Sequence, residues 1–240
     1  MRERISNFIK NINPVVLILL IVMLAESILD NTMSPGEWFI NKLMILPGIF
    51  IGLSFHEAAH GFVSYKLGDP TPKIQGRLTI NPMKHMDPAG FIALLFIGFG
   101  WGIPVQIDPR YYKNRRLGEL LVSLAGVVTN FGIAAVFALI VRLMAANMTN
   151  EFYAGLGGIL IQILVYVVYI NIILMIFNLL PVPPLDGFSV LTQIFNLEKY
   201  SWYYTVYKNG YFILLVLIIF NITTYIISPV ADFFMNWLLW

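Results

Sequence analysis

The chain has 240 residues, of which 58% are hydrophobic and 12% charged, with a mean hydropathy of +0.77 and a formal net charge of +2. A water-soluble chain of this length does not have such a composition, whereas a polytopic membrane protein does, and we expect no nucleic-acid partner. The chain contains no cysteine, which excludes disulfides and thiolate metal ligands, so any metal must be held by His, Asp or Glu. No polar stretch is long enough for a second folded unit, and we predict a single membrane domain over residues 1–240.

The first half of the chain opens with a short basic leader and an apolar run at Pro14–Leu29. This run is short and lacks a convincing small-residue cleavage site, so we predict a retained N-terminal helix rather than a signal peptide. A polar turn is predicted at Asp30–Trp38, and a second span from about Leu43 to Lys66. The polar stretch Leu67–Asp87 alternates in polarity around Gly76, which predicts a short hairpin or extended strands.

The second half of the chain contains longer apolar segments. Pro88–Ile107 carries no charge but is interrupted by glycines and proline. Clear spans are predicted at Leu120–Met144 and Gly155–Leu180, and a short helix at Phe188–Leu197. The last span is predicted at Tyr211–Ile227, ahead of an interfacial tail helix.

The distribution of basic residues orients these spans. If Pro88–Ile107 dips into the membrane and returns, thirteen of the 15 Lys and Arg residues fall on one side, and only Lys42 and Arg142 lie on the other. The positive-inside rule makes the thirteen-residue side cytoplasmic. Irregular backbone at membrane depth is tolerated where protein covers it or where it lines a wet cavity. We therefore predict an all-α polytopic membrane protein with a cytoplasmic N-terminus, five to six spans, one re-entrant segment and short strands near the cytoplasmic face.

The sequence His56-Glu57-Ala58-Ala59-His60 lies inside the second predicted span. Residues four apart share one face of a helix, so His56 and His60 can hold one metal ion through two imidazole nitrogens. Glu57 could reach a water at that metal, and the pattern is the signature of a zinc metallopeptidase. An ionisable trio inside an apolar span is costly and therefore indicates a functional site. The alternative is that these side chains only hydrogen-bond to one another inside a helical bundle.

A catalytic zinc ion usually has three protein ligands and one open position. Asp186 is the strongest candidate for the third ligand, because it follows the proline-rich run Pro181–Leu185, where a helix cannot continue normally. Asp186 could instead cap the helix that follows, and spacing alone leaves both interpretations open. His56 lies ~15 Å from the cytoplasmic end of its helix, and Pro181 lies ~35–40 Å along its own span. Both positions therefore fall in the cytoplasmic half of the membrane.

Six short motifs occur in order between about Met44 and Leu191. They are His56–Gly61, Leu67–Thr71, Gly76–Pro82, His85–Pro88, Ala125–Gly126 with Asn130, and Asn178–Gly187. Together they resemble the site-2 protease family of intramembrane zinc metalloproteases, most closely its small bacterial branch without a PDZ domain. Two positions depart from the family pattern: Val127 stands where proline is usual, and Gly100–Val105 differs from the usual Gly-Trp-Ala-Lys-Pro-Val. These departures bear on helix geometry and substrate contacts rather than on zinc chemistry.

The resemblance implies a catalytic core of three helices, which we place at about 43–191. The N-terminal helix at 14–29 precedes this core, and the C-terminal helix and interfacial tail at 209–240 follow it. The resemblance also implies a multi-pass protein of the bacterial cell membrane, whose partners are the lipid bilayer and a transmembrane protein or peptide substrate. The expected reaction is hydrolysis of a peptide bond within or near a transmembrane segment, while the motifs specify neither the substrate nor the oligomeric state.

The residue roles of the family transfer to the matching positions of this chain. His56, His60 and Asp186 are the implied ligands of one zinc ion per chain, and Glu57 is the implied general base. The resemblance also implies that Asn178 lies near the metal, where it could bind substrate backbone or the oxyanion.

Further residues are candidates for roles around the metal or the substrate. His85 could orient or gate the metal site, or could make ordinary loop hydrogen bonds. Asn130 could contact substrate, or could hydrogen-bond across helices as a buried asparagine. Extended segments near Lys73–Ile80 or Val105–Asp108 could pair with an unwound substrate as an added β-strand.

Other classes of function compete with the protease. A transporter, or a membrane protein that binds metal or protons, could use the same His and Asp side chains. A metalloprotease of another family would need a glutamate ligand, but Glu119, Glu151 and Glu198 each lie at a span end or in a loop. A binding or chaperone-like protein with a vestigial site is disfavoured by the intact His-Glu-His trio. Only the protease hypothesis predicts that Glu57→Gln keeps zinc but stops peptide cleavage.

Overall fold

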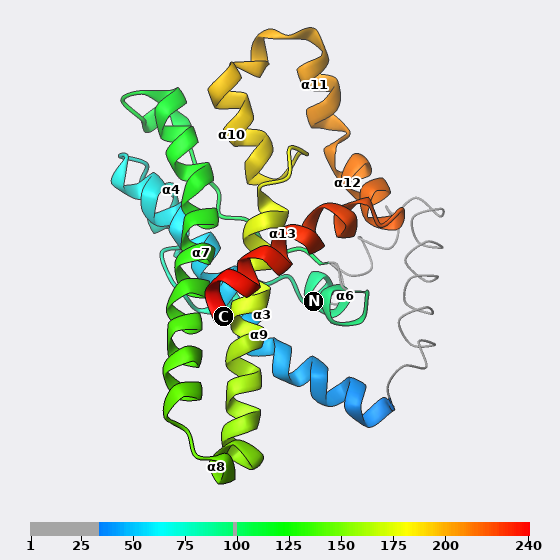
Figure 1. The fold of residues 1–240 in the computed structure, drawn as a ribbon. Coiled ribbons are helices and arrows are strands. Elements are labelled where there is room, and N and C mark those ends of the chain that lie inside the picture. The colour runs from blue at the N-terminus through cyan, green and yellow to red at the C-terminus, as the bar shows by residue number, and fades with distance from the viewer. Residues whose placement is uncertain (1–33, 98–99) are drawn as a thin grey trace. The chain divides into compact units, whose positions relative to one another are not determined.

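The structure is a computed structural model that describes residues 34–97 and 100–240 (Figure 1). The N-terminal helix predicted at Pro14–Leu29 lies outside these residues. The described residues form two compact units, the first within Met1–Leu43 and Met86–Ile103, the second within Met44–His85 and Pro104–Trp240. The second unit contains every candidate site residue.

Every regular element in the described part of the chain is a helix. In chain order they are α3 (Pro35–Lys66), α4 (Thr71–Ile74), α5 (Pro82–His85), α6 (Pro88–Ile97), η1 (Pro109–Tyr111), α7 (Arg115–Asn147), α8 (Asn150–Ala154), α9 (Leu156–Asn178), α10 (Asp186–Phe195), η2 (Leu197–Lys199), α11 (Ser201–Lys208), α12 (Gly210–Ile219) and α13 (Ile222–Leu239). Four of these helices, α3, α7, α9 and α13, are long and apolar enough to cross a membrane. The prediction of an all-α polytopic protein is therefore confirmed, as are the spans predicted within α3, α7 and α9.

Helix α3 begins at Pro35, well before the start near Leu43 that hydropathy predicted. Glu37 Oε2 accepts hydrogen bonds from Ser34 N at 2.9 Å and Ser34 Oγ at 2.8 Å, and Ser34 Oγ accepts one from Glu37 N at 3.3 Å. This reciprocal capping box, with proline at the first helical position, stabilises a helix start. The polar turn predicted at Asp30–Trp38 is therefore wrong from Pro35 onward.

The hairpin predicted within Leu67–Asp87 is wrong. The segment forms the single-turn helices α4 and α5, joined by a loop without strand pairing. Pro70 and Pro72 supply the fixed φ that suits a helix start and lack the N–H that a β-ladder needs. Gly76 closes the turn after α4 with a φ of 64°, a left-handed conformation that glycine adopts without strain.

The segment predicted to dip and return contains the ten-residue helix α6. At 1.5 Å per residue it is ~15 Å long, too short to cross a hydrocarbon core of ~30 Å. Asp87 Oδ1 accepts hydrogen bonds from the N–H groups of Ala89 and Gly90 at the start of this helix. Met86 and Gly102, which stand before and after α6 in the chain, form an isolated antiparallel bridge. The return of this segment to the side from which it enters the membrane stays a prediction.

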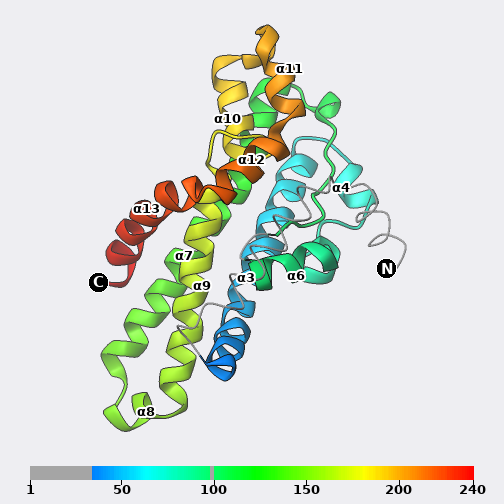
Figure 2. The same ribbon diagram turned by 90° about the vertical axis from the view of Figure 1, so that its right-hand side faces the viewer.

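The second unit is built on the antiparallel pair α7 and α9, which run side by side and are joined at one end by α8 (Figure 1, Figure 2). Val167, Val168 and Ile172 of α9 and Ala134 and Ala138 of α7 are almost completely buried. The small alanine side chains allow a close approach of the two helices, which is how apolar helices pack in lipid. Helix α10 packs against α7, and α13 packs against both long helices.

The C-terminal region differs from the prediction of one span at Tyr211–Ile227. It forms α12 and α13, separated at Asn221, whose φ of 56° is left-handed and ends the helix. Asparagine tolerates this conformation because its short polar side chain can hydrogen-bond locally. Helix α13, where an interfacial tail was predicted, packs on α7 through Phe131, which lies 5.9 Å from Phe234 and 6.3 Å from Trp237 between ring centroids.

Candidate active site

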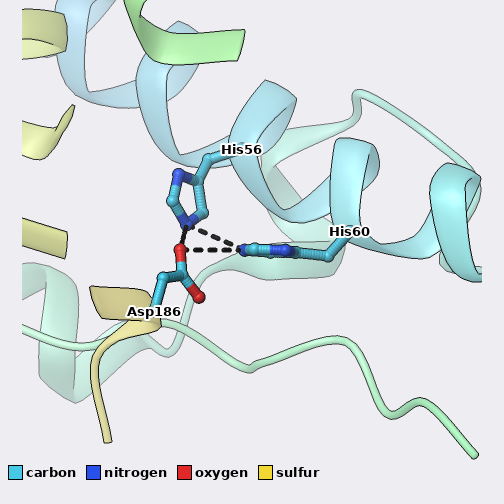
Figure 3. Close-up of side chains that lie close together, drawn as sticks. All are labelled: His56, His60 and Asp186. Carbon is cyan, nitrogen blue, oxygen red and sulfur yellow. Dashed lines mark hydrogen bonds and ion pairs between the residues drawn. The ribbon is translucent and has the colours of Figure 1, made fainter. Parts of the chain in front are cut away.

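Side chains of α3 and α10 converge on one point (Figure 3). His56 and His60 lie one turn apart on α3, and Asp186 is the first residue of α10. The Nε2 atoms of the two histidines are 3.0 Å apart, and Asp186 Oδ2 lies 3.1 Å from that of His56 and 3.3 Å from that of His60. A tetrahedral zinc ion with N and O ligands at 2.0–2.2 Å holds those atoms roughly 3.3 Å apart. The triangle therefore has the size that a zinc ion requires.

Hydrogen bonds on the far side of both imidazoles fix which nitrogen carries the proton. His60 Nδ1 lies 2.7 Å from Val122 O, a carbonyl oxygen that can only accept, so His60 Nδ1 carries hydrogen. His56 Nδ1 lies 2.7 Å from Asn130 Oδ1 in the same arrangement. In a neutral imidazole the Nε2 atom then presents a lone pair, which is the form that binds a metal.

When both imidazoles are neutral and protonated at Nδ1, three acceptor atoms face one another. Asp186 Oδ2 is buried and has no hydrogen-bond donor within the described residues. Two nitrogen lone pairs and a carboxylate oxygen at these distances repel one another unless a proton or a metal cation lies between them, because a buried charge needs a partner. The donor set of two imidazoles and one carboxylate suits zinc.

The turn after α9 places Asp186. Leu185 is the N-cap of α10 and Asp186 makes no capping hydrogen bond, so the interpretation of Asp186 as a cap is wrong. Gly187 packs directly on the end of α9, where an added Cβ would lie 2.2 Å from Leu179 O and 2.7 Å from Leu180 O. Only glycine permits this approach, which turns the start of α10 back toward α3.

The other end of α10 is held by α7. The guanidinium group of Arg116 donates to the carbonyl oxygens of Gln193 and Ile194, the latter at 2.7 Å. Glu119 Oε2 accepts a hydrogen bond from Gln193 Nε2. The last carbonyls of a helix have no partner within the helix, so a cation there completes the hydrogen bonding and fixes the helix end.

Helix α7 also shapes the space that the His56 ring occupies. A Cβ on Gly126 would lie 2.4 Å from Cε1 of the His56 ring and 2.6 Å from both ring nitrogens, so this position admits only glycine. Asn130, one turn further along α7, is fully buried and hydrogen-bonds to His56 and to Asn171 of α9. These bonds agree with the interpretation of Asn130 as a buried asparagine that hydrogen-bonds across helices, and its contact with substrate stays a prediction. The motif Ala125–Gly126 with Asn130 indicated that this part of α7 is functional. It did not indicate why position 126 must be glycine, because that depends on how closely α3 approaches α7.

Glu57 is held by the main chain of a distant segment. Its Oε2 accepts a hydrogen bond from Val105 N at 2.9 Å. Val105 belongs to the non-helical residues 103–108, which are anchored further along by Asp108 N donating to Asp69 Oδ2 at 2.8 Å. The Glu57 carboxylate, which the motif indicates as the general base, therefore has one oxygen fixed in place.

Two predicted residues lie outside the triangle of ligand atoms. His85 is fully buried, and its Nε2 lies 2.7 Å from Thr79 O, which fits the ordinary loop hydrogen bond. The structure does not place His85 in the group formed by the two other histidines and the aspartate. Asn178 is the last residue of α9, and its Nδ2 donates to Leu174 O at 2.9 Å.

Comparisons with known proteins agree with this geometry. Residues 147–220 match Peptidase family M50. The chain is 38% identical over 185 residues to a Bacillus subtilis protein named "Putative zinc metalloprotease YwhC", covering 77% of this chain and 84% of that protein. It is 26% identical over 218 residues to "Putative zinc metalloprotease Rip2" of Mycolicibacterium smegmatis, covering 86% of this chain and 80% of that protein. No solved structure matches the chain.

The chain belongs to peptidase family M50, the site-2 protease family. It is a zinc-dependent metalloprotease, and the four long apolar helices within residues 34–97 and 100–240 make it an integral membrane protein. The family and enzyme class predicted from the motifs are confirmed, and the described residues, which are helical, contain no PDZ domain. The alternative of a transporter or a metal- or proton-binding protein is not favoured by these relatives.

Proposed function

We propose that this protein hydrolyses peptide bonds within or near transmembrane segments of other proteins, using one zinc ion per chain held by His56, His60 and Asp186. The observation that carries the proposal is the triangle of His56 Nε2, His60 Nε2 and Asp186 Oδ2, whose sides are 3.0–3.3 Å long. When bound there, zinc lowers the pKa of a water and polarises the scissile carbonyl.

The protein's own groups supply the proton transfers. Glu57 takes the proton of the attacking water and later delivers it to the leaving amine. Because Val105 N–H holds Oε2, we assign the water to Oε1. The amide nitrogen of Asn178 carries two hydrogens, of which one goes to Leu174 O, and we assign the second to the developing oxyanion.

The substrate helix must unwind before its carbonyls can react, because they are otherwise bonded within that helix. The alternative docking edge at Lys73–Ile80 begins inside α4 and is therefore not extended at its start. We propose that the non-helical residues Val105–Asp108 receive the unwound strand through main-chain groups that are not bonded to Glu57 or Asp69.

The charge pattern supports an orientation for this chemistry. Helix α3 ends at Lys66, on the side that the positive-inside rule makes cytoplasmic, and His56 lies ~15 Å from that end. We propose a bacterial cell-membrane protein with a cytoplasmic N-terminus and an active site in the cytoplasmic half, reached by water from the cytoplasm.

The decisive variant is Glu57→Gln in the full chain, purified in detergent and reconstituted in vesicles with a panel of synthetic single-span peptides. We expect it to keep zinc at the parent stoichiometry and to cleave about 10²–10⁴-fold more slowly, because the general base is lost. His60→Ala should lose both zinc and cleavage. Metal analysis and mass spectrometry of the peptides measure the two quantities. Glu151→Gln, an exposed change on α8, is the control and should match the parent.

Three outcomes contradict the proposal. Cleavage by Glu57→Gln at the parent rate would remove Glu57 as the base. A parent protein that binds no zinc would contradict the proposed metal centre. A parent protein that cleaves no peptide of the panel would contradict the proposed substrate class.

A further inference from the structure

We propose that Asn171 is a positioning residue that sets the tautomer and orientation of His56 through Asn130. The inference rests on the zinc centre of the proposed function and extends it to α9, on which the motifs place no residue beside the metal except Asn178. It concerns a row of buried hydrogen bonds that joins α3, α7 and α9.

The row begins at a metal-facing ring and ends at a backbone carbonyl. His56 Nδ1 lies 2.7 Å from Asn130 Oδ1, and Asn130 Nδ2 donates to Asn171 Oδ1 at 3.2 Å. Asn171 Nδ2 in turn donates to Val167 O at 2.8 Å. Both asparagine side chains are completely buried, so water does not replace these partners.

The direction of every bond follows from the last one. A carbonyl oxygen can only accept, so Val167 O requires the NH₂ group of Asn171. The Oδ1 atom of Asn171 must then face Asn130, which requires the NH₂ group of Asn130. The Oδ1 atom of Asn130 is therefore turned to His56, whose Nδ1 must carry the proton. His56 Nε2 is left with its lone pair for zinc.

Without Asn171 this order is no longer imposed. The amide of Asn130 could turn over and offer its NH₂ group to His56 Nδ1, which would move the imidazole proton to Nε2. That proton would stand where the zinc ion binds. His60 does not need such a row, because Val122 O contacts its Nδ1 directly and a backbone carbonyl cannot turn over.

The row of hydrogen bonds lies beside α3 at a position that has no side chain. A Cβ on Gly52, one turn before His56, would lie 3.3 Å from Asn171 Oδ1 and 3.6 Å from Asn130 Nδ2. The two amides thus lie beside the backbone of α3. Turning an amide over needs no extra volume, so their hydrogen-bond partners rather than space set their orientation.

Zinc affinity of the full chain in detergent, measured by competition with a chromophoric chelator, tests the inference. We expect Asn171→Leu to weaken zinc binding about 10–100-fold, the loss that follows removal of a group behind a metal-bound histidine. A carboxylate has no donor face, so the double variant Asn130→Asp/Asn171→Leu should recover most of that loss. Val168→Ala, a cavity at a neighbouring buried position of α9, is the control and should bind zinc like the parent.

The tautomer itself can be observed, because the chain has only three histidines. In ¹⁵N-histidine-labelled parent protein, NMR should show His56 and His60 protonated at Nδ1. In Asn171→Leu only the His56 signal should change to a mixture of tautomers, with His60 as an internal reference.

The outcomes separate the two proposals. Parent-like zinc affinity and an unchanged His56 signal in Asn171→Leu would overturn this inference and leave the zinc centre intact. Failure of the double variant to recover affinity would show that Asn171 acts only through packing, which also overturns it. A parent that binds no zinc would overturn the proposed function, and this inference with it.

Discussion

Gly126 faces the imidazole of His56 at a distance that leaves no room for a methyl group. We expect Gly126→Ala to push the ring out of the triangle, because the added methyl group would meet atoms of the rigid imidazole ring, which cannot bend away. Zinc affinity should fall about tenfold or more, and the overpacked site should lose about 1–3 kcal/mol of unfolding free energy. Chelator competition and denaturant unfolding in detergent measure the two effects.

Gly132 on the same helix provides the matched control, since an added Cβ there meets nothing within 4 Å. Gly132→Ala should keep parent zinc affinity and gain helix stability of about 0.5–1 kcal/mol from the better helix propensity of alanine. Equal zinc affinity in the two alanine variants would contradict the role given to Gly126.

Side chains that act through local spacing could be predicted from the sequence, while those that act through tertiary contact could not. His56 and His60 share a helix face by their spacing alone, so their convergence followed from the chain. Asp186 required a choice between two roles that only the fold could make. Gly126 lies in one of the motifs, but nothing local indicated its contact with His56, and Asn171 has no distinguishing local pattern. The importance of both residues comes from how closely α3 approaches α7 and α9.

At the scale of elements, a buried carboxylate joins the end of α3 to α4 and to the segment that precedes α7. Asp69 accepts hydrogen bonds from Ser64 Oγ at 2.7 Å, Thr71 N at 2.9 Å and Asp108 N at 2.8 Å. Tyr112 extends this group through its hydroxyl, 2.7 Å from Ser64 Oγ. Burial alone would raise the pKa of Asp69, but the hydrogen bonds from Thr71, Asp108 and Ser64 outweigh it and lower the pKa below the ordinary 3.8.

A lowered folded-state pKa means that Asp69 stabilises the fold only when it is ionised. Its contribution is complete above the unfolded-state pKa and is lost as the pH falls through the lower folded-state pKa. We expect Asp69→Asn to lower the melting temperature in detergent at pH 7, and the difference from the parent to shrink below about pH 4. Thermal melts followed by circular dichroism over this range test it. A constant difference at all pH values would contradict it, and Glu151→Gln should follow the parent curve.

Long apolar helices could be predicted from hydropathy, but their ends depended on finer signals. The start of α3 was readable in the Ser34–Glu37 capping box, which hydropathy does not register. The short helices α4 and α5 replace a predicted hairpin because prolines outweigh an alternating pattern. The break at Asn221 carries no strong local signal, since asparagine is common in many other conformations.

For the whole molecule, the orientation in the membrane can be tested directly because the chain has no cysteine. Lys113→Cys lies before α7 on the side proposed as cytoplasmic, and Asn150→Cys lies in α8 on the opposite side, and both positions are exposed. In intact cells a membrane-impermeant maleimide should label Asn150→Cys only, and Lys113→Cys should react once the membrane is permeabilised. The reverse pattern would invert the orientation assigned from the basic residues.

The hydrogen bond from Val105 to Glu57 has a consequence for how the protein tolerates genetic variation. Its donor is a main-chain amide, which every amino acid except proline provides. The carbonyl of Val122 that contacts His60 is likewise independent of the residue type. The main-chain partners of Glu57 and His60 can therefore be kept while the amino acids at positions 105 and 122 vary among relatives. A survey of invariant positions would overlook both.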